Sequence, residues 1–63
     1  MGNKMYYTVE KYDAKTNKLI ADYGCGYELQ DVKDICKGYT IDFAKGIAFR
    51  TNGRFYYFIS EDK

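Results

Sequence analysis

The chain has 63 residues, with ten basic and nine acidic side chains, a formal net charge of +1 and no histidine. A chain of this length forms one domain at most, residues 1–63, and folding buries only about 60% of the surface that its unfolded form exposes. The near-neutral charge argues against a protein built mainly to bind polyanions, and two cysteines without any histidine are too few ligands for structural zinc, so we expect neither metal nor cofactor.

The first half of the chain predicts a β-hairpin. Residues 5–12 are rich in the β-branched and aromatic side chains that suit a pleated sheet, and residues 19–23 continue that pattern. Residues 13–18 have the composition of a turn, in which Asn17 is the natural candidate for a left-handed backbone conformation. We therefore expect two antiparallel strands here.

A short amphipathic helix is predicted next, over residues 28–37. Gly24-Cys25-Gly26 is expected to break the second strand, and apolar residues then recur at spacings of three and four, the period of one helical face. These apolar residues are Leu29, Val32, Ile35 and Cys36. Acidic side chains lie mostly toward the start of the segment and basic ones toward its end, and Gly38 is expected to end the helix in a left-handed conformation.

Three further strands are predicted in the second half of the chain, over residues 39–43, 47–51 and 54–60. Asn52-Gly53 is typical of a two-residue hairpin loop, which would place Ile47 opposite Phe58. For residues 44–46 we predict a three-residue loop, which would place Phe43 opposite Ile47. The two loops together decide which side chains share a face of the sheet.

With these loops, one apolar set of side chains lies on a single face, which we expect to be covered by the helix. The set is Ile41, Phe43, Ile47, Phe49, Tyr56 and Phe58. The predicted fold class is therefore α+β, a small antiparallel sheet in the order ββαβββ with one helix packed on one face.

The opposite face of this predicted sheet is unusually apolar for a surface in contact with water. Because tyrosine and arginine are enriched where proteins bind one another, we predict that this face binds a partner. The predicted partner-binding residues are Arg50, Arg54, Phe55, Tyr57 and Ile59. A homodimer is the simplest form of such an interaction, and cover by the first two strands or a chain terminus is the alternative.

Nucleic acid is the alternative partner for the same face. Aromatic rings on a sheet, with Arg50 and Arg54 at its edge, suit the stacking of unpaired bases. Residues 53–58 resemble the aromatic-alternating motif of RNA-recognition domains, but that fold needs two helices and this sequence predicts one. A protein partner is therefore favoured over single-stranded nucleic acid.

No set of residues predicts catalysis. Cys25 precedes a helix, but the chain has no histidine to activate a thiol. Residues 24–26 lack the third glycine of the dinucleotide-binding pattern, because that position is Leu29. The carboxylates Glu28, Asp31 and Asp34 are explained by a solvated helix face. We therefore expect a protein that is not an enzyme.

The remaining features concern location and origin. No apolar stretch approaches the length of a membrane span and no signal peptide is recognisable, so we expect a cytoplasmic protein with no membrane partner and with both cysteines reduced. Abundant Tyr, Lys, Ile, Phe and Asn are typical of AT-rich coding sequence, as in a low-GC bacterium or its phages. These features together favour a small protein-interaction or inhibitor module, similar to those that phages direct at host factors.

Overall fold

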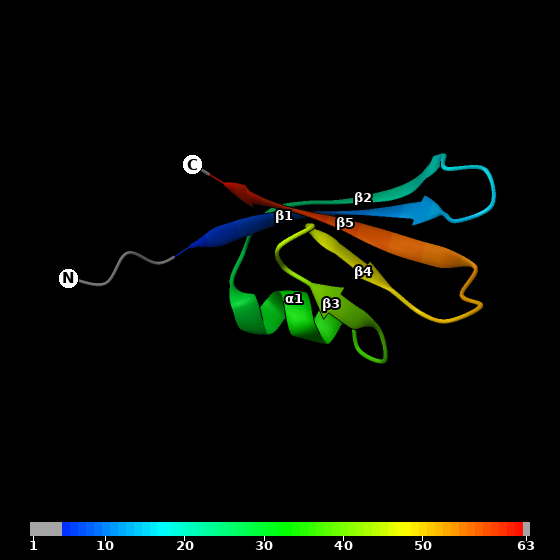
Figure 1. Ribbon diagram of the computed structural model, residues 1–63. Helices are drawn as coiled ribbons and strands as arrows, with labels where there is room; N and C mark the ends of the chain where they lie inside the picture. Colours follow the sequence, from blue (N-terminus) through cyan, green and yellow to red (C-terminus); the bar gives the residue numbers. More distant parts are fainter. Residues whose placement is uncertain (1–4, 63) are drawn as a thin grey trace.

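A computed structural model describes residues 5–62 as a twisted five-stranded sheet with one short helix against one side (Figure 1). The elements are β1 (Tyr6–Asp13), β2 (Leu19–Tyr27), α1 (Leu29–Ile35), β3 (Thr40–Asp42), β4 (Ile47–Phe49) and β5 (Phe55–Asp62). The strand order is β2-β1-β5-β4-β3, and every neighbouring pair is antiparallel. The predicted α+β class and the order ββαβββ are confirmed.

The first and last strands pair at the centre of the sheet. The ladder between β1 and β5 runs without interruption from the pair Tyr6 and Asp62 to the pair Asp13 and Phe55. Since side chains of directly opposed residues share a face, this ladder aligns the two faces of both strands along their full length. The two ends of the described chain therefore lie side by side, as Figure 1 shows.

The second strand is longer than its sequence predicts. β2 continues through Gly24-Cys25-Gly26, which we expected to break it, so that prediction is wrong. Three register shifts against β1, which are β-bulges or similar irregularities, occur along this strand, and two of them lie at the glycine segment. Asn17 in the preceding turn has the left-handed conformation that was predicted, with φ 60°.

The helix forms within the predicted segment, and only part of its apolar face is covered. Asp31 and Glu28 form a reciprocal capping box, in which the Asp31 carboxylate accepts a hydrogen bond from the Glu28 N–H at 3.0 Å. Val32 and Cys36 are fully buried against the sheet, whereas Leu29 is largely exposed. Gly38 has φ +86°, the left-handed conformation expected after the helix.

The loop between β3 and β4 differs from the predicted three-residue loop. The structure has Asp42 opposite Ile47 and Ile41 opposite Ala48, so the loop spans four residues, 43–46. Gly46 decides this register, because its N–H donates to the Asp42 carbonyl at 2.8 Å while its own carbonyl accepts from Ile59 at 2.7 Å. The one-residue slip turns every side chain of β3 to the other face.

The loop between β4 and β5 keeps the predicted register, but it is a longer loop than the one predicted. Ile47 lies opposite Phe58, as predicted. The chain does not make a two-residue loop, however, because the ladder ends at β4 and the Gly53 N–H donates to the Arg50 carbonyl at 3.0 Å. Asn52, within that turn, has φ 58°.

The helix covers the face opposite to the one we predicted, so that assignment is wrong. The core consists of Tyr7, Val9, Val32, Cys36, Ala48, Tyr57 and Ile59. The seven-residue helix buries Val32 fully, and Cys36, the residue that caps its C-terminal end, is the second small side chain buried there. Small and branched side chains such as Ala48 and Val9 accept such a helix closely, whereas a row of aromatic rings would hold it away.

Candidate functional site

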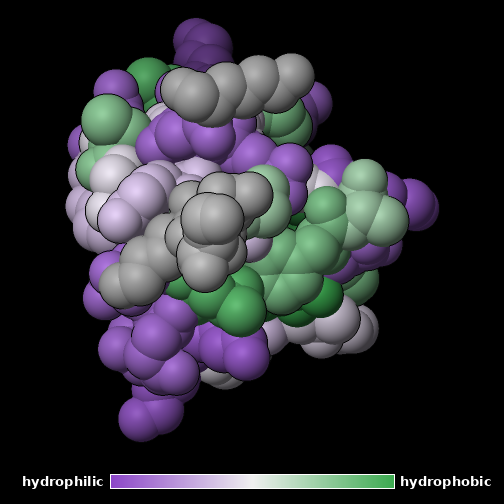
Figure 2. Space-filling view, turned by 90° about the vertical axis from the view of Figure 1, so that its left-hand side faces the viewer, coloured by the Kyte–Doolittle hydropathy of each residue, from purple (hydrophilic) through white to green (hydrophobic). Residues whose placement is uncertain are grey.

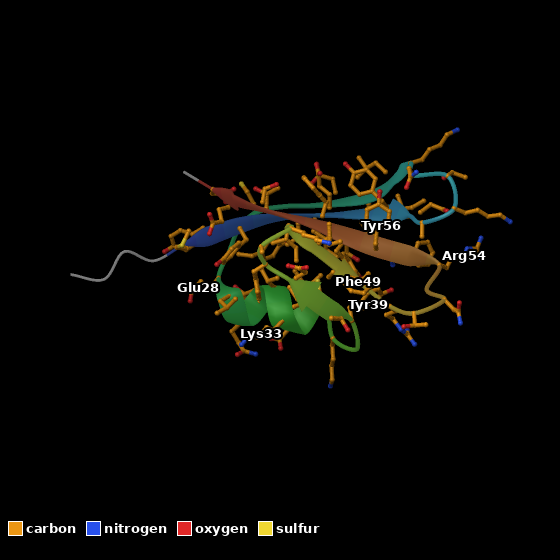
Figure 3. All side chains as sticks on the ribbon, in the orientation of Figure 1. Glu28, Lys33, Tyr39, Phe49, Arg54 and Tyr56 are labelled. Atoms are coloured by element: carbon orange, nitrogen blue, oxygen red, sulfur yellow. The ribbon has the colours of Figure 1, made fainter. Side chains whose placement is uncertain are left out.

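An aromatic strip lies on the sheet face turned away from α1, which we call the outer face. The strip consists of Tyr12, Ile47, Phe49, Tyr56 and Phe58, contributed by β1, β4 and β5. The rings of Tyr12 and Tyr56 stack, with centroids 5.4 Å apart, and Phe58 meets Tyr12 edge-on. Phe49 and Phe58 keep 41% and 42% of their surface exposed; Figure 3 labels Phe49 and Tyr56. Large apolar area is therefore in contact with water.

The charged residues of the outer face are acidic. They are Glu10, Asp22, Asp42 and Asp62, at strand positions that point away from the helix. The one basic residue in the five described strands is Lys11, which lies opposite Tyr57 and so on the other face. The Tyr12 hydroxyl donates to the Glu10 carboxylate at 3.1 Å, and this hydrogen bond raises the pKa of Tyr12. The outer face thus combines aromatic rings with negative charge.

A different surface lies on the helix side of the sheet, toward the end that carries the β1–β2 turn and the β4–β5 loop (Figures 1 and 3). We call it the cation–aromatic surface, and it consists of Lys11, Tyr39, Arg50, Arg54 and Phe55. The Lys11 ammonium lies 4.3 Å from the centre of the Phe55 ring, and the Arg54 guanidinium carbon lies 5.8 Å from the same ring. The Arg50 guanidinium carbon lies 5.6 Å from the ring of Tyr39.

The structure separates the predicted partner-binding residues into two groups. Arg50 and Arg54 are exposed and Phe55 is half-buried, and all three belong to the cation–aromatic surface. Tyr57 and Ile59, each only 5% exposed, belong to the core. The expectation that they lie on an uncovered face is therefore wrong, because that face is the one that α1 covers.

Tyr57 packs against two other tyrosine rings in the core. Its ring meets those of Tyr23 and Tyr39 edge-on, at centroid distances of 5.9 and 5.0 Å. Burial, followed by a hydrogen bond with Tyr23, raises the pKa of the Tyr57 hydroxyl. Tyr57 thus packs edge-on against the ring of Tyr39, and the Arg50 guanidinium lies over that same ring.

Sequence reasoning missed Lys11 and Tyr39 as members of the cation–aromatic surface. Lys11 comes from β1, far from Arg54 along the chain, and reaches Phe55 because β1 pairs with β5. The alternation of side chains along β1 places Lys11 on the same face as Val9, a signal that the sequence does contain. This alternation assigns Lys11 to the cation–aromatic surface only once the strand order, which places β1 beside β5, is known.

A shallow apolar cleft lies at the opposite end of the molecule, where α1 begins. Its lining residues are Met5, Tyr7, Glu28 and Leu29, and its volume is about 290 Å³. Hydrophobic residues gather on this end among hydrophilic ones, as Figure 2 shows. The cleft brings one acidic side chain and no set of convergent polar groups to a ligand, unlike a typical small-molecule site.

The glycine segment of β2 does not offer free backbone donors to a phosphate. The Gly24 N–H donates to the Asp22 carboxylate at 2.9 Å, and the Gly26 N–H donates to Asp62 at 3.2 Å. These acidic groups would also repel an anion. Cys25 in this segment is exposed and Cys36 is buried, both as free thiols, and burial raises the pKa of Cys36 to about 11.

Within residues 5–62, no helix has the length and hydrophobicity that crossing a bilayer requires. The chain matches no protein-family model, no curated protein and no solved structure, so the function must be inferred from the surfaces described above.

Proposed function

We propose that this protein is a non-enzymatic interaction or inhibitor module whose outer face binds the surface of another protein. The observation that carries the proposal is the aromatic strip, in which Phe49 and Phe58 remain more than two-fifths exposed on the sheet. Contiguous exposed apolar surface of this kind usually marks a binding site. The strip lies on regular strands, so its rings are held in place before binding and little ordering entropy is lost.

The charges around the strip indicate the chemistry of the partner. Since Glu10, Asp22 and Asp42 lie on the outer face without a basic residue among the strand positions, a complementary surface is apolar and bordered by lysine or arginine. A symmetric homodimer through this face would bring the same acidic groups of two copies together. We therefore favour a different protein as the partner over self-association.

Affinity capture with tagged variants tests this proposal. The wild-type protein is used as bait in a nuclease-treated lysate of a low-GC bacterium, and bound proteins are identified by mass spectrometry. We expect a stoichiometric partner that Phe58→Thr and Phe49→Thr each reduce at least tenfold, because a truncated anchor residue at an interface costs about 2 kcal/mol or more. Threonine suits an exposed strand position, so both variants should keep the fold.

Leu29→Thr is the matched control, because Leu29 is an equally exposed apolar residue on α1 and lies outside the outer face. It should retain the partner in full. Circular dichroism and urea unfolding establish that all three variants are folded. Capture that Phe58→Thr and Phe49→Thr leave unchanged, or that Leu29→Thr lowers equally, would overturn the proposed function.

A further inference from the structure

We propose that the cation–aromatic surface is a second binding site, whose ligand is single-stranded nucleic acid. This inference does not depend on the proposed function, because it concerns the opposite face of the sheet and other residues. It rests on the way in which the structure combines exposed cations with aromatic rings, and on the distribution of charge between the two faces.

The geometry of the cations and rings supports this inference. Lys11 and Arg54 both lie over Phe55, and Arg50 lies over Tyr39. Phe55 and Tyr39 therefore each turn one ring face toward charged side chains at the surface and not only toward the core. Bases stack on such faces, and the neighbouring cations are within reach of the phosphates that flank a stacked base.

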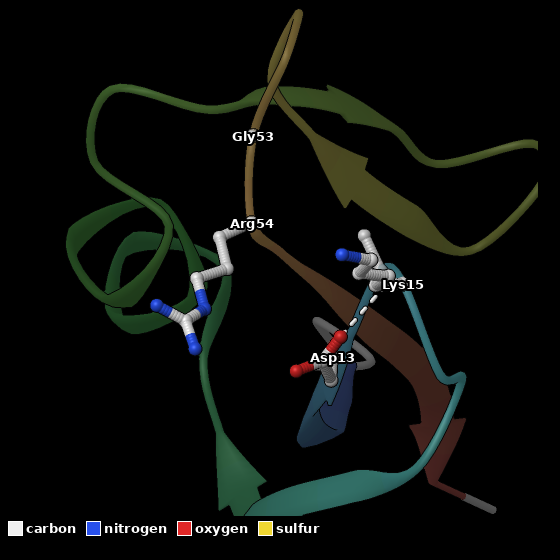
Figure 4. A pocket seen from close by; sticks show the side chains of 5 residues that line it. Asp13, Lys15, Gly53 and Arg54 are labelled. Carbon is white, nitrogen blue, oxygen red and sulfur yellow. Dashed lines mark hydrogen bonds between the residues drawn. The ribbon is translucent and has the colours of Figure 1, made fainter.

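The loops at this end of the molecule form a cleft beside the cation–aromatic surface. A cleft of about 560 Å³ is lined by Asp13, Ala14, Lys15, Gly53 and Arg54, and it joins the β1–β2 turn to the start of β5. The Arg54 side chain extends to one side of this cleft and Lys15 lies on the other (Figure 4). Two cations thus border the cleft, and Arg54 belongs both to the cleft and to the cation–aromatic surface.

The negative charge in the cleft is directed toward the turn. The Asp13 carboxylate accepts hydrogen bonds from the backbone N–H groups of Lys15 and Thr16, at 2.7 and 3.1 Å. These bonds lower the pKa of Asp13, so that its carboxylate stays ionised, and they direct it toward the backbone of the turn. Ala14 further joins the turn to β5, since its N–H donates to the Arg54 carbonyl at 2.9 Å, so the backbone on both sides of the cleft is held together.

The aromatic rings distinguish nucleic acid from an acidic protein as the ligand. An acidic peptide needs the cations but has no group that requires the faces of Phe55 and Tyr39. Every cation–ring contact in residues 5–62 occurs at this one end, and the acidic residues of the sheet gather mainly on the other face. Single strands suit the surface better than a duplex, because their bases are free to stack.

Fluorescence anisotropy with labelled oligothymidylate of about 15 nucleotides tests the site. We expect saturable binding at about 50 mM salt that weakens steeply as salt is raised. Arg50→Gln and Arg54→Gln should each weaken binding several-fold and make the slope of log affinity against log salt shallower by about 0.7. Phe55→Leu should weaken binding about tenfold through the loss of stacking.

Three controls keep the result interpretable. Lys33→Gln removes a charge from α1, away from the cation–aromatic surface, and should leave oligonucleotide binding unchanged (Figure 3). Polyglutamate serves as a competitor with negative charge but no bases, and it should displace the oligonucleotide poorly. Phe58→Thr, which tests the outer face, should also have no effect here.

Three results would overturn the inference. The first is the absence of saturable binding by the folded wild-type protein, and the second is a loss of affinity in Lys33→Gln equal to that in Arg54→Gln. The third is displacement by polyglutamate as effective as displacement by unlabelled oligothymidylate, which would assign the surface to an acidic protein instead. Arg50→Gln and Arg54→Gln change exposed side chains, so the test does not depend on the half-buried Phe55 alone.

Discussion

Cys36 illustrates how the core changes the chemistry of a single side chain. It is 1% exposed and lies between the helix and the sheet, and burial raises the pKa of its thiol to about 11. The thiol of an unfolded chain loses its proton near its ordinary pKa of about 8.5. The unfolded state therefore releases this proton at lower pH than the folded state does.

This difference predicts a fall in stability at alkaline pH. The pKa of Cys36 is higher in the folded state than in the unfolded state. Its contribution to the free energy of unfolding is therefore complete below about pH 8.5 and is lost as the pH rises toward about 11. By about pH 10 the Cys36 contribution should have decreased by roughly 1–2 kcal/mol. Urea unfolding between neutral and alkaline pH measures this, and Cys36→Ala should make the pH dependence shallower while lowering stability at neutral pH.

Cys25→Ala is the control for this experiment, because Cys25 is exposed. Tyrosine ionisation contributes to the wild type and to both variants, and among the tyrosines with a shifted pKa only Tyr57 is affected by Cys36, which raises the pKa of its hydroxyl after burial and the neighbouring tyrosines. Equal pH dependence in Cys36→Ala and Cys25→Ala would show that the Cys36 thiol is accessible to water. The interpretation of its environment would then be wrong.

At the scale of elements, the loop between β3 and β4 is the part of the fold most dependent on one position. Gly46 has φ +71° and approaches β5 so closely that a Cβ atom would lie 2.6 Å from the Ile59 carbonyl oxygen. The same residue supplies the carbonyl that accepts the Ile59 N–H. This contact joins the loop to β5 and determines which face of β3 is directed toward the helix.

Gly46→Ala should therefore destabilise the protein more than a left-handed conformation alone explains. Gly38→Ala is the matched variant, since Gly38 has φ +86° but nothing lies within 4 Å of its Cβ position. We expect Gly38→Ala to cost about 1–2 kcal/mol of unfolding free energy, and Gly46→Ala to cost clearly more, because the loop must move away from β5. Urea unfolding of both variants measures the difference, and equal losses would contradict the role of the close contact.

Several elements could be predicted from local sequence, and others could not. The period of Val32 and Cys36 identified the helix, and the turn residue Asn17 identified the first hairpin. The path of β2 through Gly24-Cys25-Gly26 could not be predicted, because an edge strand tolerates bulges that glycine makes easy. The register of β3 depended on the contact between Gly46 and Ile59, which are distant along the chain.

At the scale of the whole molecule, charge is divided between two surfaces. The strand positions of the outer face carry acidic residues, whereas Lys11, Arg50 and Arg54 gather on the helix side. The net charge of +1 conceals this separation, because composition averages over both faces. A nearly neutral chain can therefore present one surface that suits a basic partner and another that suits an anionic one.

The separation predicts how self-association responds to salt. Association of two copies through their outer faces is opposed by repulsion between like charges, and salt screens that repulsion. We expect a monomer at low ionic strength and, where self-association occurs, a dimer fraction that increases as salt is raised. Sedimentation velocity at about 50 and about 500 mM salt measures this, the Debye length falling from roughly 14 to about 4 Å.

The opposite response would identify a different contact. A dimer that forms at low salt and dissociates as salt is raised would require the cation–aromatic surface of one copy to bind the acidic outer face of another. Phe58→Thr and Arg54→Gln distinguish the two arrangements, because each alters only one of these surfaces. Dissociation by salt would contradict the expectation that like charge keeps the molecules apart.

The sequence by itself determined the class of fold and the type of each element. Strand and helix composition, turn residues and hydrophobic period act over a few neighbouring residues, so they could be interpreted without knowing the strand order. They also predicted that Arg50, Arg54 and Phe55 share one surface, and the structure places these three together with Lys11. That this surface binds a partner stays a prediction.

Only the tertiary structure decided which face of the sheet the helix covers. Both faces of β4 and β5 are apolar, so alternation along these strands fits either assignment, and the register of β3 and the pairing of β1 with β5 settle it. Val9 opposite Ile59, and Ala48 opposite Tyr57, form the close-packed side that accepts a short helix. The larger rings remain on the outer face because no element in residues 5–62 is available to cover them, and the candidate interface follows from that.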